Sequence, residues 1–179
     1  MSRRLMTSRG DVIVRPAIPD DAAAVRELRL DALARHPEAF AADHDLTQAE
    51  SAQHWVDWIA DNAAQNRGMI AVAVAEERVI GMTGLVRGKW PKTRHSGTIW
   101  GVYVRPAWRG LRVAEALLDT CIEWAREQGL TIVKLGVVTG NVAAIRCYAR
   151  AGFTVYGVEP QVIHHAGVLH DELLMAKTI

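Results

Sequence analysis

The chain has 179 residues, of which 50% are hydrophobic and 23% charged, a composition typical of a soluble globular protein with a sizeable core. Its formal net charge of +1 creates no global field that would recruit nucleic acid or an anionic membrane. No apolar run is long enough for a transmembrane helix, and the segment from Met1 to Asp11 lacks the apolar core of a secretory signal. We therefore expect a cytoplasmic protein without nucleic-acid or membrane partners.

The sequence predicts a short N-terminal tail followed by a single domain. We expect residues 1–10 to form a flexible, solvated tail. Residues 11–179 should form a single domain, because no repeat, low-complexity tract or linker divides them. Val12–Pro16 predicts a first strand, and Asp20 and Asp21 supply N-cap and first-turn acids for a helix.

Two helices are expected before the next strands. His36-Pro37 ends the first helix, and residues 37–45 predict a loop with a helical turn. Apolar residues, including Trp55 and Trp58, then recur at helical spacing, which predicts a second helix from Leu46 to about Ala64.

The middle of the chain is rich in strands. Met69–Ala75 and Val79–Val86 flank the polar residues Glu76–Arg78 and predict a hairpin. The basic segment Arg87–Ser96 predicts an exposed loop, and Thr98–Val104 predicts the next strand.

The remaining elements are two helices and three strands. They are a helix from Val113 to Gly129, a strand over Leu130–Val138, a short helix from Asn141 to Ala151, and strands over Phe153–Val158 and around Leu173–Ala176. Helices alternate with strands only in part, and hairpins account for the rest. We therefore expect an α/β or α+β sandwich, a mixed sheet with helices on both faces.

One strand-turn-helix unit has the features of an anion site. The run from Val102 to Leu118 is a β-branched strand that ends at Pro106, turns through Arg109-Gly110, and opens into an amphipathic helix. Several backbone N–H groups then point at one spot, with the positive end of a helix behind them. A diphosphate would fit there, although a plain strand-to-helix connection has the same pattern.

A second informative stretch, Asn141 to Phe153, contains a candidate helix N-cap and, further along the same helix, a tyrosine. Asn141 is well placed as the N-cap of its helix. Tyr148 follows seven residues later, on roughly the same helix face. In isolation Tyr148 is also consistent with a packed ring whose hydroxyl is wet.

Together the two stretches resemble the GNAT superfamily of N-acetyltransferases. That family has an Arg/Gln-x-x-Gly-x-Gly/Ala motif, followed later by Asn-x-x-Ala-x-x-x-Tyr-x-x-x-Gly-Phe. The first motif is matched in part, by Arg109 and Ala114. The second is matched throughout, by Asn141, Ala144, Tyr148, Gly152 and Phe153. The order of elements also matches from Val12 to about Ala176.

The resemblance implies a binding site for acetyl-CoA. Two parallel strands, Thr98–Val104 and Leu130–Val138, would splay apart around the pantetheine arm, and the turn before the long helix would hold the pyrophosphate. The implied cofactor-binding residues are Val102, Tyr103, Val104, Arg109, Gly110, Leu111, Arg112, Val113, Ala114, Glu115, Asn141 and Tyr148.

Arg112 departs from the family pattern, which has glycine there. A glycine lets the backbone approach a pyrophosphate closely and adopt unusual dihedral angles. Arg112 can still offer its N–H if its backbone is already helical. Its guanidinium then either adds a phosphate contact or points to solvent. We expect binding to be retained, because Gly110 and the helix start are intact.

The implied reaction is direct transfer of an acetyl group to an amine, with Tyr148 as the catalytic acid that protonates the departing thiolate. The amine must first lose a proton, and no base is evident. The family often has a glutamate on the strand before the Arg-Gly turn, whereas this chain has Ile99, Trp100, Gly101 and Tyr103. Alternatives are Glu38, His54, His95, or a water chain to a backbone carbonyl.

The acceptor should be held by the first two helices and the loop Arg87–Ser96. Trp55, Trp58 and Trp90 are candidates for that pocket, although the first two also fit a core. The basic residues of the loop have two interpretations. They attract an acidic acceptor or the phosphate of CoA, or they form a solvated turn without a binding role.

No metal is expected, because the seven histidines lack metal-ligand spacing, and adjacent His164-His165 point apart if extended. Cys121 and Cys147 fall in predicted helices and are expected to be buried thiols rather than a disulfide.

The leading hypothesis is an acetyl-CoA-dependent N-acetyltransferase that modifies a primary amine of a small or amino-acid-like molecule. One alternative is a protein acetyltransferase acting on an N-terminus or a lysine. Another is a non-catalytic acyl-CoA-binding regulatory module. Homodimers are frequent in the family, and the sequence leaves the oligomeric state open.

Overall fold

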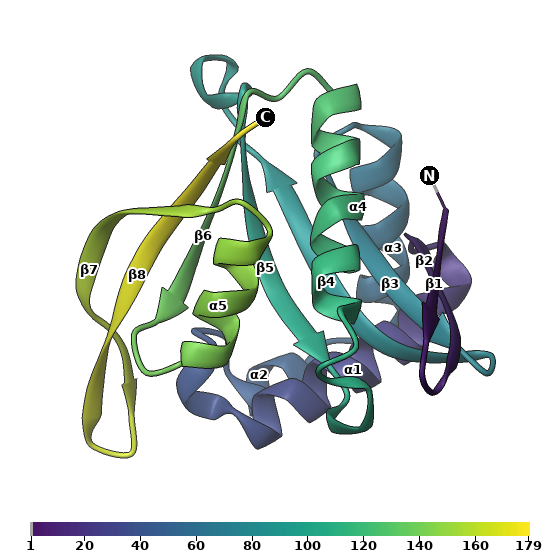
Figure 1. The fold of residues 1–179 in the computed structure, drawn as a ribbon, viewed down its shortest axis with the longest axis horizontal. Coiled ribbons are helices and arrows are strands. Elements are labelled where there is room, and N and C mark those ends of the chain that lie inside the picture. The colour runs from purple at the N-terminus through teal and green to yellow at the C-terminus, as the bar shows by residue number, and fades with distance from the viewer. Residues whose placement is uncertain (1) are drawn as a thin grey trace.

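Eight strands form one mixed sheet in a computed structural model that describes residues 2–179 (Figure 1). The strands are β1 (Arg3–Thr7), β2 (Gly10–Pro16), β3 (Gly68–Ala75), β4 (Arg78–Arg87), β5 (Ser96–Val104), β6 (Ile132–Val138), β7 (Thr154–His165) and β8 (Val168–Thr178). Their spatial order is β1-β2-β3-β4-β5-β6-β8-β7, and β5 and β6 form the one parallel pair in this part of the chain. The expected mixed α/β sheet is confirmed.

The helices cover both faces of the sheet. They are α1 (Ala22–Arg35), α2 (His44–Ala49), α3 (Ala52–Ala64), α4 (Val113–Glu127) and α5 (Val142–Arg150). In the view of Figure 1, α4 and α5 lie on the near face, and α1 and α3 on the far face.

Strand β3 shows how the sequence serves both faces. Its side chains alternate between two hydrophobic clusters. Ala71 and Ala73 pack on the side of α4, whereas Ile70 and Val72 pack on the side of α1 and α3. The central strand is buried on both sides, which is why it appears in the sequence as a continuous apolar run.

The N-terminus differs from the expected flexible tail. Arg3–Thr7 forms β1, which pairs antiparallel with β2. Leu5 packs against the cluster under α4, and Arg3 pairs with Asp119 on that helix at 2.7 Å and also with Glu123. The segment contains no continuous apolar run, so its strand character depends on these distant partners and was not evident from the sequence.

The expected single helix over Leu46–Ala64 is also wrong, because the chain forms two helices there. Ser51 interrupts the helical path and caps α3, its hydroxyl accepting a hydrogen bond from the His54 N–H at 3.1 Å. Asp43 caps α2 in the same way through the Leu46 N–H at 2.9 Å. Apolar spacing alone does not reveal such a break, since the buried residues Trp55 and Ile59 both belong to the second helix and the first buries only Thr47.

The C-terminal hairpin is longer than the expected strands over Phe153–Val158 and Leu173–Ala176. Strands β7 and β8 run to a tight turn at Ala166 and Gly167, which have φ of +49° and +80°. Most β7 side chains are exposed and the strand is irregular, so it lacks a clear alternation of apolar residues.

The expected burial of the two cysteines is confirmed. Cys121 and Cys147 are free and buried, and burial raises the pKa of each thiol to about 12. Among residues 2–179, no helix has the length and apolar character needed to cross a membrane.

Candidate functional site

The parallel strands β5 and β6 separate after a short paired segment. They pair at Ser96 with Ile132, Gly97 with Val133, and Thr98 with Lys134, and pairing stops there. Beyond this point β5 continues alongside β4, while β6 continues alongside β8 (Figure 1). The expected splay between two parallel strands is therefore present.

A bulge in β5 accompanies the separation. The register between β4 and β5 shifts between Met82 and Gly84, opposite Trp100 to Tyr103. Gly101 lies in this irregular segment with a φ of +64°, a left-handed conformation that glycine adopts without steric cost. A bulge bends its strand, so this segment turns β5 away from β6.

The turn after β5 presents unpaired amides at the start of α4. Gly110 has a φ of +78°, and the first backbone hydrogen bond of the helix runs from the Ala116 N–H to the Arg112 carbonyl at 3.1 Å. No backbone carbonyl in the described chain accepts a hydrogen bond from the amides of residues 110–115. Unpaired amides at the positive end of a helix are a backbone arrangement that binds anions.

Arg112 is the N-cap residue of α4 and is not helical, contrary to the condition under which we expected its N–H to be available. Its φ of +61° and ψ of +20° are left-handed, the conformation in which the family's glycine would be unstrained. A non-glycine residue there costs about 1–2 kcal/mol. The side chain is exposed and makes no capping hydrogen bond.

Arg109 is engaged with the end of β5. Its Nε donates to the Val104 carbonyl at 3.0 Å, its Nη2 lies 3.1 Å from His36 Nε2, and the guanidinium lies 5.5 Å from the centre of the Tyr103 ring. The Tyr103 hydroxyl donates to Asp31 Oδ2 at 2.7 Å, on the α1 face. The side chains of Arg109 and Tyr103 therefore brace the turn.

The other predicted residues of this turn differ in exposure. Val113 is buried in the core under α4, and Leu111, Ala114 and Val102 pack against that core while partly exposed. Glu115 forms an ion pair with Arg150 of α5 at 2.7 Å. This pair joins the first turn of α4 to α5.

Helix α5 contributes the second half of the site. The Asn141 side-chain oxygen accepts from the Ala144 N–H at 3.2 Å, which confirms the N-cap. Tyr148 is 7% exposed, with its ring 6.4 Å from that of Phe153. Burial, with further contributions from Cys147 and Glu172, raises the pKa of Tyr148 well above its usual value. Its hydroxyl is therefore protonated at neutral pH.

Topology brings these two halves together. Because β5 and β6 are parallel, the turn after β5 and the helix after β6 begin at the same edge of the sheet (Figure 1). The unpaired amides, the open part of the splay and the start of α5 thus lie at one edge.

A cavity of about 320 Å³ lies on the opposite face of the sheet, against β5. It is lined by Arg29 of α1, Glu50, and His54, Trp55 and Trp58 of α3, together with Thr47, Ala42, Val86 and Trp100. Trp55 and Trp58 also belong to the cluster under α1 and α3, so they serve both core and cavity.

Arg29 is the residue of this cavity that sequence reasoning missed. It is only 8% exposed and falls between Val25 and Leu33, within the buried stripe of α1. A β-carbon on Gly101 would lie 3.4 Å from Arg29 Nη1, so the guanidinium contacts the β5 bulge. The available signal was a charged residue at an apolar position of the helical repeat.

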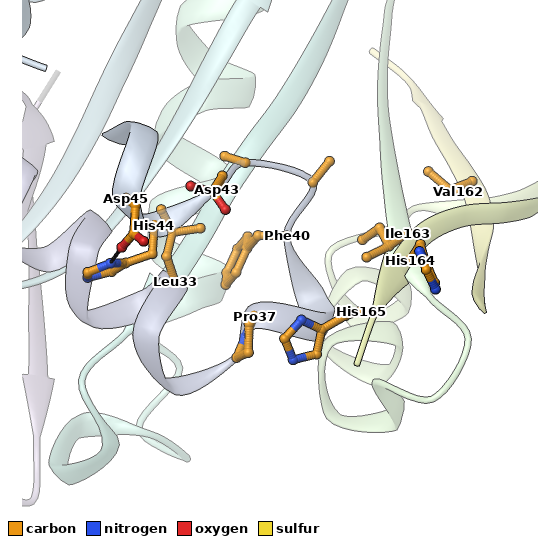
Figure 2. A pocket seen from close by; sticks show the side chains of 12 residues that line it. Leu33, Pro37, Phe40, Asp43, His44, Asp45, Val162, Ile163, His164 and His165 are labelled. Atoms are coloured by element: carbon orange, nitrogen blue, oxygen red, sulfur yellow. Dashed lines mark hydrogen bonds and ion pairs between the residues drawn. The ribbon is translucent and has the colours of Figure 1, made fainter. Parts of the chain in front are cut away.

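A larger cavity of about 360 Å³ lies between the loop after α1 and the end of β7. Figure 2 shows Leu33 and Phe40 on one wall, and Ile163 and His165 on the facing one. Ala42 lines both cavities. Phe40 connects them further, since the Arg29 guanidinium lies 5.0 Å from the centre of its ring.

The base and acceptor candidates are dispersed. His54 lines the smaller cavity, whereas Glu38 and His95 line neither cavity. The His95 carbonyl accepts from Thr131 at 2.8 Å, at the end of the sheet away from the splay. Trp90 is 66% exposed and lies outside both cavities. No group of three or more potential ligands for a metal occurs within residues 2–179.

Comparisons with known proteins agree on one family. The model of the acetyltransferase (GNAT) family matches residues 25–153. The chain is 35% identical to an L-methionine sulfoximine/L-methionine sulfone acetyltransferase from Pseudomonas aeruginosa, over 59% of this chain and 61% of that protein. It is 30% identical to a mycothiol acetyltransferase from Brachybacterium faecium, over 90% of this chain and 51% of that protein.

A solved structure extends the likeness to the fold. The protein yncA from Salmonella typhimurium, solved with its cofactor acetyl-CoA, superposes with a TM-score of 0.82 at 25% identity, over 93% of each chain. The present chain thus spans almost all of this structural neighbour. It spans between half and two thirds of the length of the two curated relatives.

Proposed function

Because the chain belongs to the GNAT family of acetyltransferases, we propose that it is an acetyl-CoA-dependent N-acetyltransferase. Its acceptor would be the primary amine of a small, amino-acid-like molecule. The relatives that act on methionine sulfoximine and mycothiol support a small acceptor.

The observation that carries this proposal is the edge where the unpaired amides of residues 110–115 adjoin the splay of β5 and β6. These amides fit a pyrophosphate, which accepts hydrogen bonds through several oxygens. The backbone of β5 beyond Thr98 has no strand partner on the β6 side. It can therefore pair with the amide groups of a pantetheine arm.

In this proposal the predicted cofactor residues act mainly through their backbones. Gly110 to Glu115 hold the pyrophosphate, and Val102 and Tyr103 pair with the pantetheine. The Val104 carbonyl already accepts a hydrogen bond from Arg109. Val104 would therefore line the pantetheine arm without accepting a hydrogen bond from it. Asn141 uses its side-chain oxygen for the cap, which leaves its amide nitrogen for the cofactor.

Tyr148 would supply the proton for the leaving group. Bound acetyl-CoA provides the thioester carbon that the amine nitrogen attacks. As the new C–N bond forms and the C–S bond breaks, the Tyr148 hydroxyl donates its proton to the thiolate. Tyr148 is protonated at neutral pH, and burial raises its pKa further, so the proton is present when the C–S bond breaks.

The amine must lose a proton before it attacks. Among Glu38, His54 and His95, only His54 lines the cavity against β5. His54 is therefore the side chain to test as base, acting directly or through water.

The first experiment is a thermal shift with acetyl-CoA, followed by thiol release across a panel of small amines and peptides. We expect stabilisation by acetyl-CoA and turnover of small amines. Turnover of peptides alone would favour protein acetylation. Binding without turnover of any acceptor would favour a regulatory module.

A further inference from the structure

Arg29 is a buried cation without a counter-ion. Among residues 2–179 it has no ion-pair partner, and its Nη1 has no hydrogen-bond acceptor. Burial lowers its pKa to about 10, and the charge of Glu50 partly offsets this effect. Arg29 is therefore still charged at neutral pH. A buried charge with unused donors is costly unless something pairs with it.

Two further unused donors line the same cavity. The indole nitrogens of Trp55 and Trp100 are buried and also lack acceptors. Indole and guanidinium groups donate hydrogen bonds and accept none. Three side chains around one cavity thus carry a buried donor without an acceptor, although the Trp100 indole nitrogen also packs against Gly84. An oxyanion would supply the acceptors that such donors lack.

Glu50 gives the cavity a second, opposite charge. It lines the cavity with Arg29 but forms no ion pair with it, and its nearest ionic contact is His54 at 3.9 Å. An α-amino acid carries a carboxylate and an ammonium group only a few bonds apart. The cavity is thus lined by one side chain of each charge, as these two groups would require.

The cavity is also placed for the proposed reaction. Arg29 contacts the β5 bulge at Gly101, and Trp100 precedes that glycine. Val102 and Tyr103, which follow it, are the proposed pantetheine contacts. An acceptor held by Arg29 would therefore lie on the far side of β5 from the cofactor edge, close to the bulge.

We propose that Arg29 is the acceptor-recognition residue and binds the carboxylate of an amino-acid-like amine, with the Trp55 and Trp100 indoles as supporting donors and Glu50 facing the ammonium group. This inference rests on the proposed acetyltransferase function. A carboxylate suits the site because it pairs with a planar guanidinium through two parallel hydrogen bonds.

The competing explanation is that Arg29 is structural. Its guanidinium lies 5.0 Å from the Phe40 ring and 5.7 Å from the Trp100 ring, and cation–π contacts of this kind stabilise a buried arginine. In that case removal of Arg29 would lower stability without changing acceptor preference.

The test compares α-amino acids with their α-carboxamides, pair by pair, as acceptors for the wild type, Arg29→Met, Arg29→Lys and the control Arg35→Met. Arg35 lies on the same helix and its side chain is 57% exposed. A carboxamide also lowers the pKa of the neighbouring amine, so the informative quantity is the change in the acid-to-amide ratio of kcat/KM between variants.

We expect Arg29→Met to reduce that ratio roughly 10- to 100-fold, mainly through KM for the acids, because a charged hydrogen-bond partner is lost. Arg29→Lys should recover part of it, and Arg35→Met should leave it unchanged. An unchanged ratio in a folded Arg29→Met protein would overturn the proposal.

A binding measurement covers the cases in which a variant does not fold or no amine is turned over. N-acetyl amino acids and N-acetyl amino acid amides are titrated into the wild type in the presence of CoA. Tighter binding of the acids supports the anion site even if the transferase proposal fails. Equal binding overturns the anion site, whatever the enzyme's activity.

Discussion

Arg112 has a left-handed backbone conformation, which favours glycine over arginine. Its left-handed conformation immediately precedes α4, within the run of amides that have no backbone acceptor. The exposed side chain has no partner that compensates for this strain in the described chain. The turn thus holds an arginine in a conformation that glycine adopts without strain, at a cost in stability.

We predict that Arg112→Gly raises the free energy of unfolding by up to about 1 kcal/mol, because the strain exceeds the entropy that glycine gains in the unfolded state. Acetyl-CoA affinity should be retained. Arg112→Ala is the control, since it removes the guanidinium but keeps the strain. Urea unfolding and acetyl-CoA titration measure both effects. Weaker binding in both variants would instead assign the guanidinium a phosphate contact.

Tyr148 combines a buried ring with the chemistry proposed for its hydroxyl. We predict that Tyr148→Phe lowers kcat about 100-fold or more, with little effect on acetyl-CoA affinity, because only the proton donor is lost. Tyr156→Phe is the matched control, as Tyr156 is 57% exposed on β7. Thiol release and acetyl-CoA titration separate the two quantities. An unchanged kcat would remove Tyr148 from the chemistry.

At the scale of elements, an ion pair connects β2 to the start of α1. Arg15 donates to both carboxylate oxygens of Asp21, at 2.6 and 2.9 Å, and the Ile18 N–H donates to the same group at 2.8 Å. Burial alone would raise the pKa of Asp21. The Arg15 and Ile18 hydrogen bonds outweigh it and hold the pKa below its usual value.

A lowered pKa in the folded state means that this group stabilises the fold above the unfolded pKa near 4 and loses that effect at lower pH. We predict that Asp21→Asn lowers the free energy of unfolding at pH 7 by about 1–2 kcal/mol, and that its difference from the wild type shrinks at pH 3. Urea unfolding at both pH values tests this. Asp11→Asn breaks the exposed pair with Arg4 and should have a smaller effect. An equal loss at pH 3 and pH 7 would exclude the ionic explanation.

Sequence reasoning succeeded where the signal is local. Asn141 caps α5 as predicted, and the hairpin of β3 and β4 follows its apolar runs. It failed where a strand depends on contacts with residues far along the chain, or where most side chains of a strand are exposed and its apolar residues do not alternate clearly. Examples are β1, which is tied to α4 through Arg3, and the exposed strand β7.

The site divides in the same way. The proposed cofactor turn and Tyr148 lie in contiguous motifs that can be found by spacing. Arg29 becomes informative only when its burial and its lack of a hydrogen-bond acceptor at Nη1 are known. The strain at Arg112 likewise requires a backbone angle. Tertiary geometry therefore revealed the cavity that we propose as the acceptor side of the site.

At the scale of the whole molecule, the sheet separates stability from the proposed chemistry. Strand β5 lies at the centre of the site, with the cofactor turn after it, the splay beside it and Arg29 against its bulge. Strand β1 forms one edge of the sheet, with β2, β3 and β4 between it and β5. Arg9, in the turn between β1 and β2, lies 5.7 Å from the centre of the Trp108 ring in the turn after β5. Changes within Arg3–Thr7 itself should reach the site mainly through overall stability.

We predict that deletion of residues 2–8 lowers the free energy of unfolding by about 1–3 kcal/mol, because it removes the Leu5 packing and the strand that covers β2. The kcat/KM for acetyl transfer should stay within about twofold of the wild type, since Arg3–Thr7 lines neither cavity and lies outside the turn of residues 110–115. Arg3→Ala is the control and should cost less, because it breaks only part-exposed ion pairs. Urea unfolding and thiol release measure the two effects. A deletion variant that folds, as judged by circular dichroism, but has lost acetyl transfer would show that the N-terminal strand contributes to the site itself.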